Sequence, residues 1–216
     1  MIFNLTHKNS IASKLIADLR DVQIQKDRQR FRSNLVKLGE IFAYEISKTL
    51  HYEEKQVETS LGVANCMIPT ERIVIVPILR AALPLHQGLL NIFDEADNGF
   101  ISAYRKHHKD GTFEISVDYL TCPDLENCTF ILVDPMLATG SSIDASLKAI
   151  KSYGTPKQIH VVTAIAASFG VQFIRRYYPA VNIWVGALDD ELTAKSYIVP
   201  GLGDAGDLAF GNKLQD

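Results

Sequence analysis

The stretch from Ile131 to Asp144 reads "ILVDPMLATGSSID" and decides the fold class of this chain. Apolar residues lead into an acid, Asp134, and a proline, and a short run of small residues with hydroxyl groups and a glycine follows. Beyond that run, Ile143, Leu147 and Ile150 recur at helical spacing. A buried strand that continues through a loop into a helix is the repeating unit of α/β folds.

Similar apolar runs occur before and after this stretch. "RIVIVPIL" (72–79), "QIHVVTAIAA" (158–167) and "VNIWVGALD" (181–189) are rich in Val and Ile and nearly continuous, which is typical of strands covered on both faces. The segments between them that have a helical pattern are 83–95, 142–153 and 170–178. Alternating strands and helices predict an α/β fold with a mostly parallel sheet flanked by helices.

Two segments depart from this alternation. Residues 11–50 have a helical pattern and predict an N-terminal helical arm. In residues 101–120, "ISAYR" and "TFEISVDYL" flank "KHHKDG", which predicts a β-hairpin with an Asp-Gly turn and a basic tip. The tip residues are Lys106, His107, His108 and Lys109. A hairpin added to a parallel sheet is suited to act as a hood over a binding site.

Length and composition predict a single domain, residues 1–216. The 216 residues are 47% hydrophobic and 22% charged, enough to bury one sizeable core. The helical arm (about 1–50), the hairpin hood (about 101–120) and a glycine-rich loop (about 197–207) are expected as parts of that domain. The net charge of −3 gives no general attraction to nucleic acid or anionic membranes.

Location is predicted from the cysteines and the apolar segments. Cys66, Cys122 and Cys128 lack metal-binding spacing, so we expect reduced thiols. The N-terminus lacks the pattern of a secretion signal, and the longest apolar stretch, 161–171, is too short to span a bilayer. We expect a cytoplasmic protein.

The loop after Asp134 has the features of a phosphate site. Asp134 ends a predicted parallel strand, where ligands of α/β sheets gather. Thr139 to Ser142 would offer hydroxyls and backbone N–H groups at a helix start, and Gly140 permits the left-handed turn such a loop needs. Ser141 and Asp144 fit a capping box. The lysine of nucleoside-triphosphate loops is absent, so a ribose 5-phosphate suits the stretch better. An ordinary capped helix explains these residues equally well.

Arg80 directly follows the strand of "VPILRAALPLHQGLL" (76–90). At the carboxyl end of a strand it could bind a pyrophosphate, although pairing with a surface carboxylate explains it equally well in isolation. Pro84 predicts the start of the next helix. His86 is interpreted as a helix-packing residue.

The stretch "YIVPGLGDAGDLAFG" (197–211) holds four glycines and two aspartates. Such a glycine content lets a backbone approach a flat ligand closely and present its N–H and C=O groups. A flexible tail is the alternative, but apolar residues in the stretch favour an anchored, functional loop.

Together these stretches resemble those of the uracil phosphoribosyltransferases, a family of type I phosphoribosyltransferases. The family's stretches read close to "VPILRAGL", "VDPMLATGGS" and "YIIPGLGDAGD", and here they are "VPILRAAL", "VDPMLATGSS" and "YIVPGLGDAGD". "RFRSNLVKLGEIFAYE" and "AYRK" extend the likeness over nearly the whole chain. The resemblance implies transfer of the 5-phosphoribosyl group from 5-phosphoribosyl 1-diphosphate (PRPP) to uracil, with Mg²⁺ as cofactor, yielding UMP in pyrimidine salvage.

The resemblance also implies residue roles. Catalytic residues would be Arg80 and Arg105, which meet the pyrophosphate, and Asp204, which faces PRPP and its Mg²⁺ and is a candidate acceptor of the uracil proton. PRPP would be bound by Arg80, Arg105, Asp134, Pro135, Met136, Leu137, Ala138, Thr139, Gly140, Ser141, Ser142 and Asp204. Uracil would be bound by Ile198, Gly203, Asp204 and Ala205. GTP is an implied candidate effector, and a homodimer or higher homo-oligomer is implied.

The chain departs from the family pattern at several places. Ala82 and Ser141 replace glycines, and "AASFG" (166–170) and "ALDDELTAKS" (187–196) diverge. We expect these changes to affect rate or regulation rather than substrate class. Two alternatives remain: a non-catalytic regulator that binds PRPP or UMP, and a transferase for another base.

Overall fold

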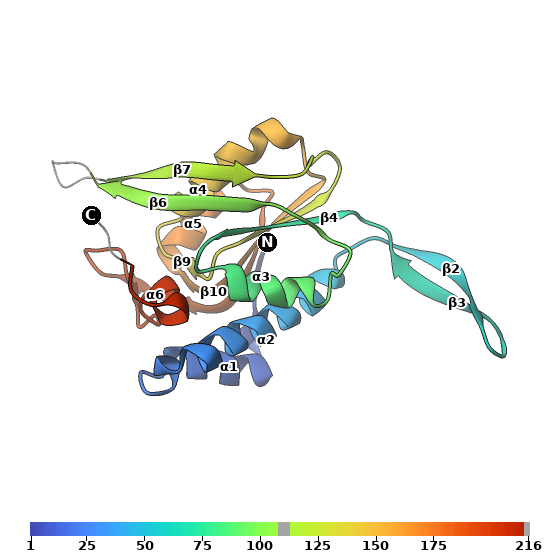
Figure 1. The fold of residues 1–216 in the computed structure, drawn as a ribbon, viewed down its shortest axis with the longest axis horizontal. Helices are drawn as coiled ribbons and strands as arrows, with labels where there is room; N and C mark the ends of the chain where they lie inside the picture. Colours follow the sequence, from blue (N-terminus) through green and yellow to red (C-terminus); the bar gives the residue numbers. More distant parts are fainter. Residues whose placement is uncertain (108–112, 214–216) are drawn as a thin grey trace.

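The computed structural model describes the backbone of residues 1–107 and 113–213, and the side chains of these residues outside 104–116 (Figure 1). The predicted Asp-Gly turn and the outer part of the basic tip, at 108–111, lie outside the described residues.

The centre of the molecule is a mixed sheet, and the predicted mostly parallel α/β architecture is confirmed. Its strand order is β1-β11-β10-β8-β4-β6-β7, and all neighbours are parallel except β6 and β7. The strands are β1 (Ile2–Asn4), β4 (Ile73–Leu79), β6 (Phe100–His107), β7 (Phe113–Thr121), β8 (Thr129–Val133), β10 (Gln158–Ala167) and β11 (Asn182–Asp189). Short strands β5 (Asp97–Asn98) and β9 (Met136–Leu137) pair with β4 and β10.

Helices cover both faces of the sheet, as the continuous apolar runs require. One face packs against α1 (Ile11–Arg20), α2 (Arg28–Ser47), α3 (Leu83–Leu90) and α6 (Ala205–Phe210). The other face packs against α4 (Ser141–Ala149) and α5 (Ser168–Tyr177). Short 3₁₀ turns lie at Leu5–His7, Ile24–Lys26 and Ile150–Tyr153. The second of these separates α1 from α2 in the helical arm.

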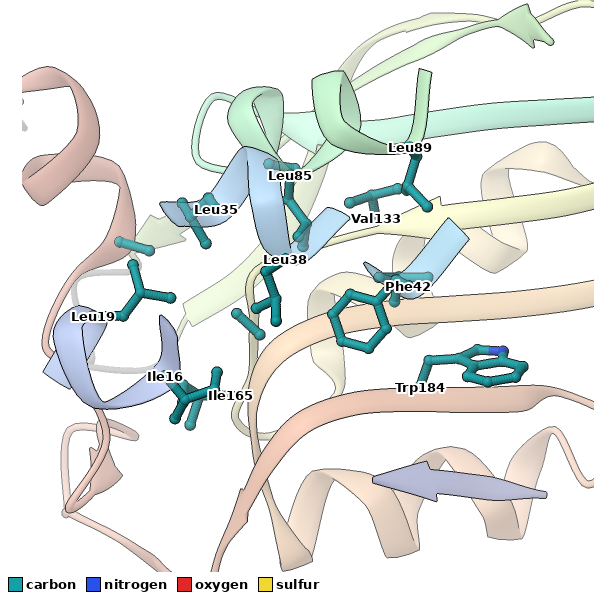
Figure 2. Packing of buried hydrophobic residues seen from close by; sticks show 14 of the residues in the cluster. Ile16, Leu19, Leu35, Leu38, Phe42, Leu85, Leu89, Val133, Ile165 and Trp184 are labelled. Carbon is teal, nitrogen blue, oxygen red and sulfur yellow. The ribbon is translucent and has the colours of Figure 1, made fainter. Parts of the chain in front are cut away.

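The largest cluster of core residues lies between α2, α3 and the sheet (Figure 2). Leu38 and Phe42 of α2 are completely buried and point toward the strands. Burying a side chain of this size contributes about 1.5–3 kcal/mol to stability. The two helices cross so closely that a Cβ at Gly39 would lie 2.3 Å from the carbonyl oxygen of Leu85. Glycine at this crossing therefore fixes α3, and with it the loop that leads into α3 from β4.

An additional hairpin, β2 (Tyr52–Thr59) and β3 (Gly62–Pro69), extends away from the sheet (Figure 1). We call it the β2–β3 arm. Sequence patterning did not predict it, because most of its residues are exposed on both faces and no alternation of apolar and polar residues results. Leu61 at its tip is 98% exposed.

The cysteines are free thiols, and burial raises the pKa of Cys122 and of Cys128 to about 11. Pro84 lies in the first turn of α3, as predicted. His86 is buried against Asn98, so its packing role is confirmed. In the part of the chain that is described, none of the helices has both the length and the apolar character needed to cross a membrane.

Candidate active site

The candidate site lies at the carboxyl ends of β4 and β8. These strands are parallel neighbours, with Pro77 opposite Val133. Asp134 directly follows Val133, and Arg80 follows the last residue of β4. The register therefore brings the acid and the arginine to the same edge of the sheet, although they are 54 positions apart in sequence.

Asp134 is held in place by backbone contacts and is half-buried. Its N–H donates to the carbonyl of Val162 at 3.1 Å, and its Oδ1 accepts the N–H of Met136 at 3.3 Å. Burial raises the pKa of its carboxyl to about 7, and the hydrogen bond from Met136 only partly opposes this rise. Among the described side chains, no cation forms an ion pair with it. The carboxylate is thus available to accept hydrogen bonds from a ligand's hydroxyls.

The loop that follows turns into α4 through Gly140. This glycine is the helix N-cap with φ +89°, in the left-handed region. Thr139 and Ser141 approach each other, their hydroxyl oxygens 2.9 Å apart. The predicted capping box is wrong, because Ser141 is already in the helix and Asp144 instead contacts Lys148. The N–H of Ser141 donates to Oγ1 of Thr139 at 3.3 Å, and Gly140 offers no side-chain cap to the next N–H groups of α4, which therefore suit an anionic ligand.

Helix α5 supports this loop from behind. A Cβ at Gly170 would lie 2.4 Å from the carbonyl oxygen of Ala138, so only glycine permits this approach. A Cβ at Gly140 would likewise lie 2.8 Å from Cδ1 of Phe173. Gly170 belongs to the divergent stretch 166–170, and its packing against the loop was not apparent from the sequence.

Arg80 contacts the C-terminal segment. Its Nη2 donates to Oδ1 of Asp207 at 3.0 Å and to the carbonyl of Gly211 at 2.6 Å. The neighbouring Ala82 is completely buried and has right-handed helical geometry, φ −75° and ψ −13°, which requires no glycine. The segment predicted to bind the base is therefore attached to the loop predicted to bind pyrophosphate.

The glycine-rich stretch is anchored, which the sequence favoured over a flexible tail. Ile198 is buried in β13 (Ile198–Val199), which pairs with β12 (Glu191–Leu192). Gly203 has φ +97°, and a Cβ there would meet only a leucine methyl, at 3.9 Å. A cavity of about 360 Å³ opens beside Gly203 and Asp204. Its other lining residues are Gln25, Lys26, Arg28, Leu202, Asp207, Leu208 and Asn212.

Asp204 is the N-cap of α6, and Ala205 is the first residue of that helix. The Oδ1 atom of Asp204 accepts the N–H of Asp207 at 3.0 Å, and its Oδ2 lies 3.6 Å from Nζ of Lys213. One carboxylate oxygen thus has a structural role, while the other faces a single cation. A ligand could therefore contact Oδ2 if Lys213 moved aside, or if the ligand and Lys213 contacted this oxygen together.

A carboxylate of this kind fits the limited role that a protein has toward Mg²⁺ bound to a pyrophosphate. The described residues hold no group of three or more His, Cys, Asp or Glu side chains arranged for a metal. Magnesium in phosphate-transfer sites typically uses one or two carboxylates, substrate oxygens and water. Oδ2 of Asp204 is a suitable single ligand of that type.

The backbone of the β6–β7 hairpin places Arg105 near this edge. Strand β6 runs parallel to β4, with Leu79 opposite Ser102. Arg105 lies three residues further along β6 and is paired with Ile115 of β7. The hairpin therefore continues beyond the end of β4, on the side from which the Arg80 loop departs. The side chains of Arg105, Lys106 and His107 lie outside the described residues.

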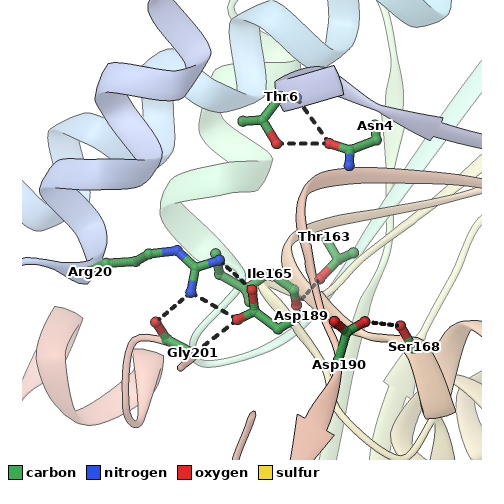
Figure 3. A network of polar contacts seen from close by, with 9 residues as sticks. All are labelled: Asn4, Thr6, Arg20, Thr163, Ile165, Ser168, Asp189, Asp190 and Gly201. Atoms are coloured by element: carbon green, nitrogen blue, oxygen red, sulfur yellow. Dashed lines mark hydrogen bonds and ion pairs between the residues drawn. The ribbon is translucent and has the colours of Figure 1, made fainter. Parts of the chain in front are cut away.

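Sequence reasoning missed one polar network at the site (Figure 3). Arg20, at the end of α1, forms a bidentate ion pair with Asp189 at the end of β11, with distances of 2.8 and 2.6 Å. Both residues also hold the backbone of Gly201. The available signal was an acid at the carboxyl end of a buried strand, the same signal that singled out Asp134.

Known proteins resemble this chain over nearly its whole length. The family model for uracil phosphoribosyltransferase matches residues 6–212. A Porphyromonas gingivalis protein named uracil phosphoribosyltransferase is 45% identical over 214 residues, covering 99% of both chains. A Pyrococcus furiosus protein of the same name is 42% identical over 205 residues, covering 94% of this chain and 87% of the relative.

Solved structures agree in fold. An Aquifex aeolicus protein superposes with a TM-score of 0.88 at 32% identity, covering 100% of both chains. A hypoxanthine phosphoribosyltransferase from Staphylococcus aureus has a TM-score of 0.50 at 14% identity, covering 85% of this chain and 83% of its own, which is a likeness of fold alone. The chain belongs to the uracil phosphoribosyltransferase family, because the family model matches nearly all of its residues and relatives of that name are 42–45% identical to it.

Proposed function

We propose that this protein transfers the 5-phosphoribosyl group of PRPP to uracil in pyrimidine salvage. N1 of uracil forms a bond to C1 of the ribose, the bond from C1 to the pyrophosphate oxygen breaks, and the N1 proton passes to an acceptor. The products are UMP and pyrophosphate. The observation that carries this proposal is the contact of Arg80 with the glycine-rich segment, beside the Asp134 loop.

PRPP would bind along the edge formed by the two strand ends. Asp134 would accept hydrogen bonds from ribose hydroxyls, and the loop 135–142 would surround the 5-phosphate. Arg80 and Arg105 would bind the pyrophosphate, with Mg²⁺ neutralising charge on the same group. Negative charge grows on the leaving pyrophosphate as the bond breaks, so fixed cations there favour the transition state over the substrate.

Uracil would be recognised through the backbone near Ile198, Gly203 and Ala205. Between Tyr197 and Asp207 the chain has no Asn, Gln, Ser or Thr that could pair with the edge of the base. A fixed carbonyl facing N3–H and fixed N–H groups facing the uracil oxygens would reject cytosine, because its edge reverses part of that pattern. A base that left these buried backbone groups unpaired would bind much more weakly, which gives strong selectivity for uracil.

Asp204 is our candidate acceptor for the N1 proton and a single ligand for Mg²⁺. Its N-cap bond to Asp207 fixes the carboxylate beside Gly203, and the cavity there gives a ligand access to it. This fixed position supports a direct role of Asp204 in the site.

The assembly that we propose is a homodimer or higher homo-oligomer. The β2–β3 arm supports this proposal, because an isolated two-stranded hairpin is at best marginally stable in water. Val63 and Met67 on the arm are 66% and 60% exposed.

A cytoplasmic location is proposed together with the activity, since PRPP is an intracellular metabolite. GTP as an effector stays a prediction.

A direct test mixes the protein, PRPP and Mg²⁺ with each free nucleobase in turn and measures nucleoside monophosphate. UMP should form from uracil only when Mg²⁺ is present, and cytosine and purines should be much poorer acceptors. Binding of PRPP or UMP without any turnover would favour a non-catalytic regulator. Turnover with a different base would favour the second alternative.

A further inference from the structure

The ion pair of Arg20 and Asp189 encloses the backbone of one residue, Gly201. Nη1 of Arg20 donates to the carbonyl of Gly201 at 2.9 Å, and the N–H of Gly201 donates to Oδ2 of Asp189 at 2.9 Å (Figure 3). Both polar backbone groups of Gly201 are therefore held by the same two side chains. The Asp189 carboxylate is 6% exposed, so these charged hydrogen bonds are protected from water.

Gly201 is also fixed sterically. Its φ is +57°, and a Cβ there would lie 2.2 Å from the carbonyl oxygen of Ile198. The Arg20 carbonyl accepts a hydrogen bond from Nε2 of Gln25 at 3.0 Å, which connects the end of α1 to the wall of the cavity beside Gly203. The pair thus links two helical segments, strand β11 and the glycine-rich stretch.

The far end of the stretch is held independently. Nη1 of Arg32 in α2 donates to the carbonyl of Ala209 at 2.6 Å, and Arg80 donates to that of Gly211. Residues 202–204 therefore lie between two fixed points. Fixing Gly201, three residues after Ile198 and two before Gly203, determines where the backbone groups on either side point.

We propose that Arg20 and Asp189 are positioning residues that hold the base-reading backbone in register and thereby set affinity and selectivity for uracil. The inference rests on the proposed function and assigns to this pair no contact with PRPP. Pre-formed hydrogen-bonding groups avoid the cost of ordering a loop when a ligand binds. Breaking the pair should therefore weaken binding of uracil and leave PRPP binding unchanged.

The main test variant is Asp189→Asn, which keeps the size of the side chain and one carbonyl oxygen. That oxygen cannot serve Arg20 and Gly201 as two carboxylate oxygens do, so at least one charged hydrogen bond is lost. We expect KM for uracil to rise about tenfold to a hundredfold, with KM for PRPP unchanged at saturating uracil. The preference for uracil over cytosine should fall.

A second variant keeps the test valid if Asp189→Asn impairs folding. The double variant Arg20→Gln, Asp189→Asn restores a neutral hydrogen-bonding pair without leaving the half-buried arginine unpaired. Its KM for uracil should be lower than that of Asp189→Asn, and a double-mutant cycle that includes Arg20→Gln would detect this as coupling. The matched control is Asp97→Asn, which breaks an Arg–Asp pair with Arg72 at the amino end of β4 and should change neither KM.

Hydrogen exchange supplies a readout independent of turnover. Amides of residues 201–204 should lose protection in Asp189→Asn, while those of β8 and β10 keep theirs. Equal rises in both KM values would overturn the inference, and so would a lower melting temperature with an unchanged KM for uracil. In either case, UMP formation by the wild-type protein would still support the proposed function. Absence of UMP from the wild-type protein would refute the proposed function, and the inference with it.

Discussion

Arg80 and Asp207 form an ion pair, with Nη2 and Oδ1 3.0 Å apart, across 127 positions of sequence. The pair joins the end of β4 to α6. The same guanidinium is the group that we assign to the pyrophosphate of PRPP. Because its side chain is 38% exposed, it remains accessible to a ligand while it is paired.

Replacing Arg80 with alanine should strongly impair use of PRPP. A charged contact with the pyrophosphate is lost, and Asp207 is left facing that group, so we expect kcat/KM for PRPP to fall by about 2–4 kcal/mol. Steady-state kinetics at saturating uracil measure this. Arg72→Ala, a change at the opposite end of β4, should have little effect, and an equal loss in both variants would contradict the assignment.

Asp134→Asn should stabilise the free protein at high pH and weaken its use of PRPP. The folded-state pKa of Asp134, about 7, lies above its ordinary value of 3.8. Stability from this group is therefore full below about pH 4 and is lost as pH rises toward 7. Asparagine does not ionise, so thermal unfolding should favour the variant more at pH 8 than at pH 4.

The same variant is expected to lower kcat/KM for PRPP by about 1–3 kcal/mol, because one charged hydrogen bond to the ribose is not made. Unchanged kinetics would remove Asp134 from the site. A melting difference that is the same at both pH values would contradict the raised pKa.

Gly170→Ala should disturb the phosphate loop from a distance. The added methyl group would overlap the carbonyl of Ala138, so α5 or the loop must move, at a cost of about 1–3 kcal/mol. We expect a higher KM for PRPP and a lower melting temperature. Gln172→Ala, on an exposed position of α5, is the control, and equal behaviour of the two variants would argue against this support of the loop.

Gly203→Ala should damage use of uracil through backbone geometry alone. Space for a methyl group is available, but φ of +97° costs a residue with a Cβ about 1–2 kcal/mol. KM for uracil should rise, while KM for PRPP stays close to that of the wild-type protein. A uracil complex in which side chains from elsewhere held the base edge would refute backbone recognition.

Arg105→Ala should slow turnover and leave the melting temperature unchanged. Its backbone position beyond the end of β4 supports contact with the pyrophosphate rather than with the core. Rapid-mix and steady-state assays of UMP formation measure the rate. A large loss of stability would instead assign Arg105 a structural role.

The strands, loops and helices that depend on local sequence patterns could be predicted from the sequence. The β8 strand, Asp134 and the following loop and helix were recognisable because apolar periodicity and loop chemistry are adjacent in the chain. The start of α4 was predicted less well, because Gly140, rather than Ser141, takes the N-cap position. Propensity rules favour serine there, but the close approach of Phe173 requires a residue without a side chain.

Contacts between distant segments could not be predicted from patterns. Arg20 and Asp189 are 169 positions apart, and nothing in either local stretch indicates the other. The β2–β3 arm was missed for a different reason, since strands exposed on both faces lack the alternation that identifies strands. Long-range polar pairs and the β2–β3 arm can therefore be recognised only in the three-dimensional structure.

The arginine contacts to Gly201, Ala209 and Gly211 have a consequence for biosynthesis. All three arginines lie in the first 80 residues, and their partners are among the last sixteen. A ribosome produces the N-terminal residues first, so these guanidinium groups are made more than 100 residues before the carbonyls that they bind. A chain cut before residue 201 would therefore keep the residues of every strand in the central sheet but lack most of the segment that we propose reads the base.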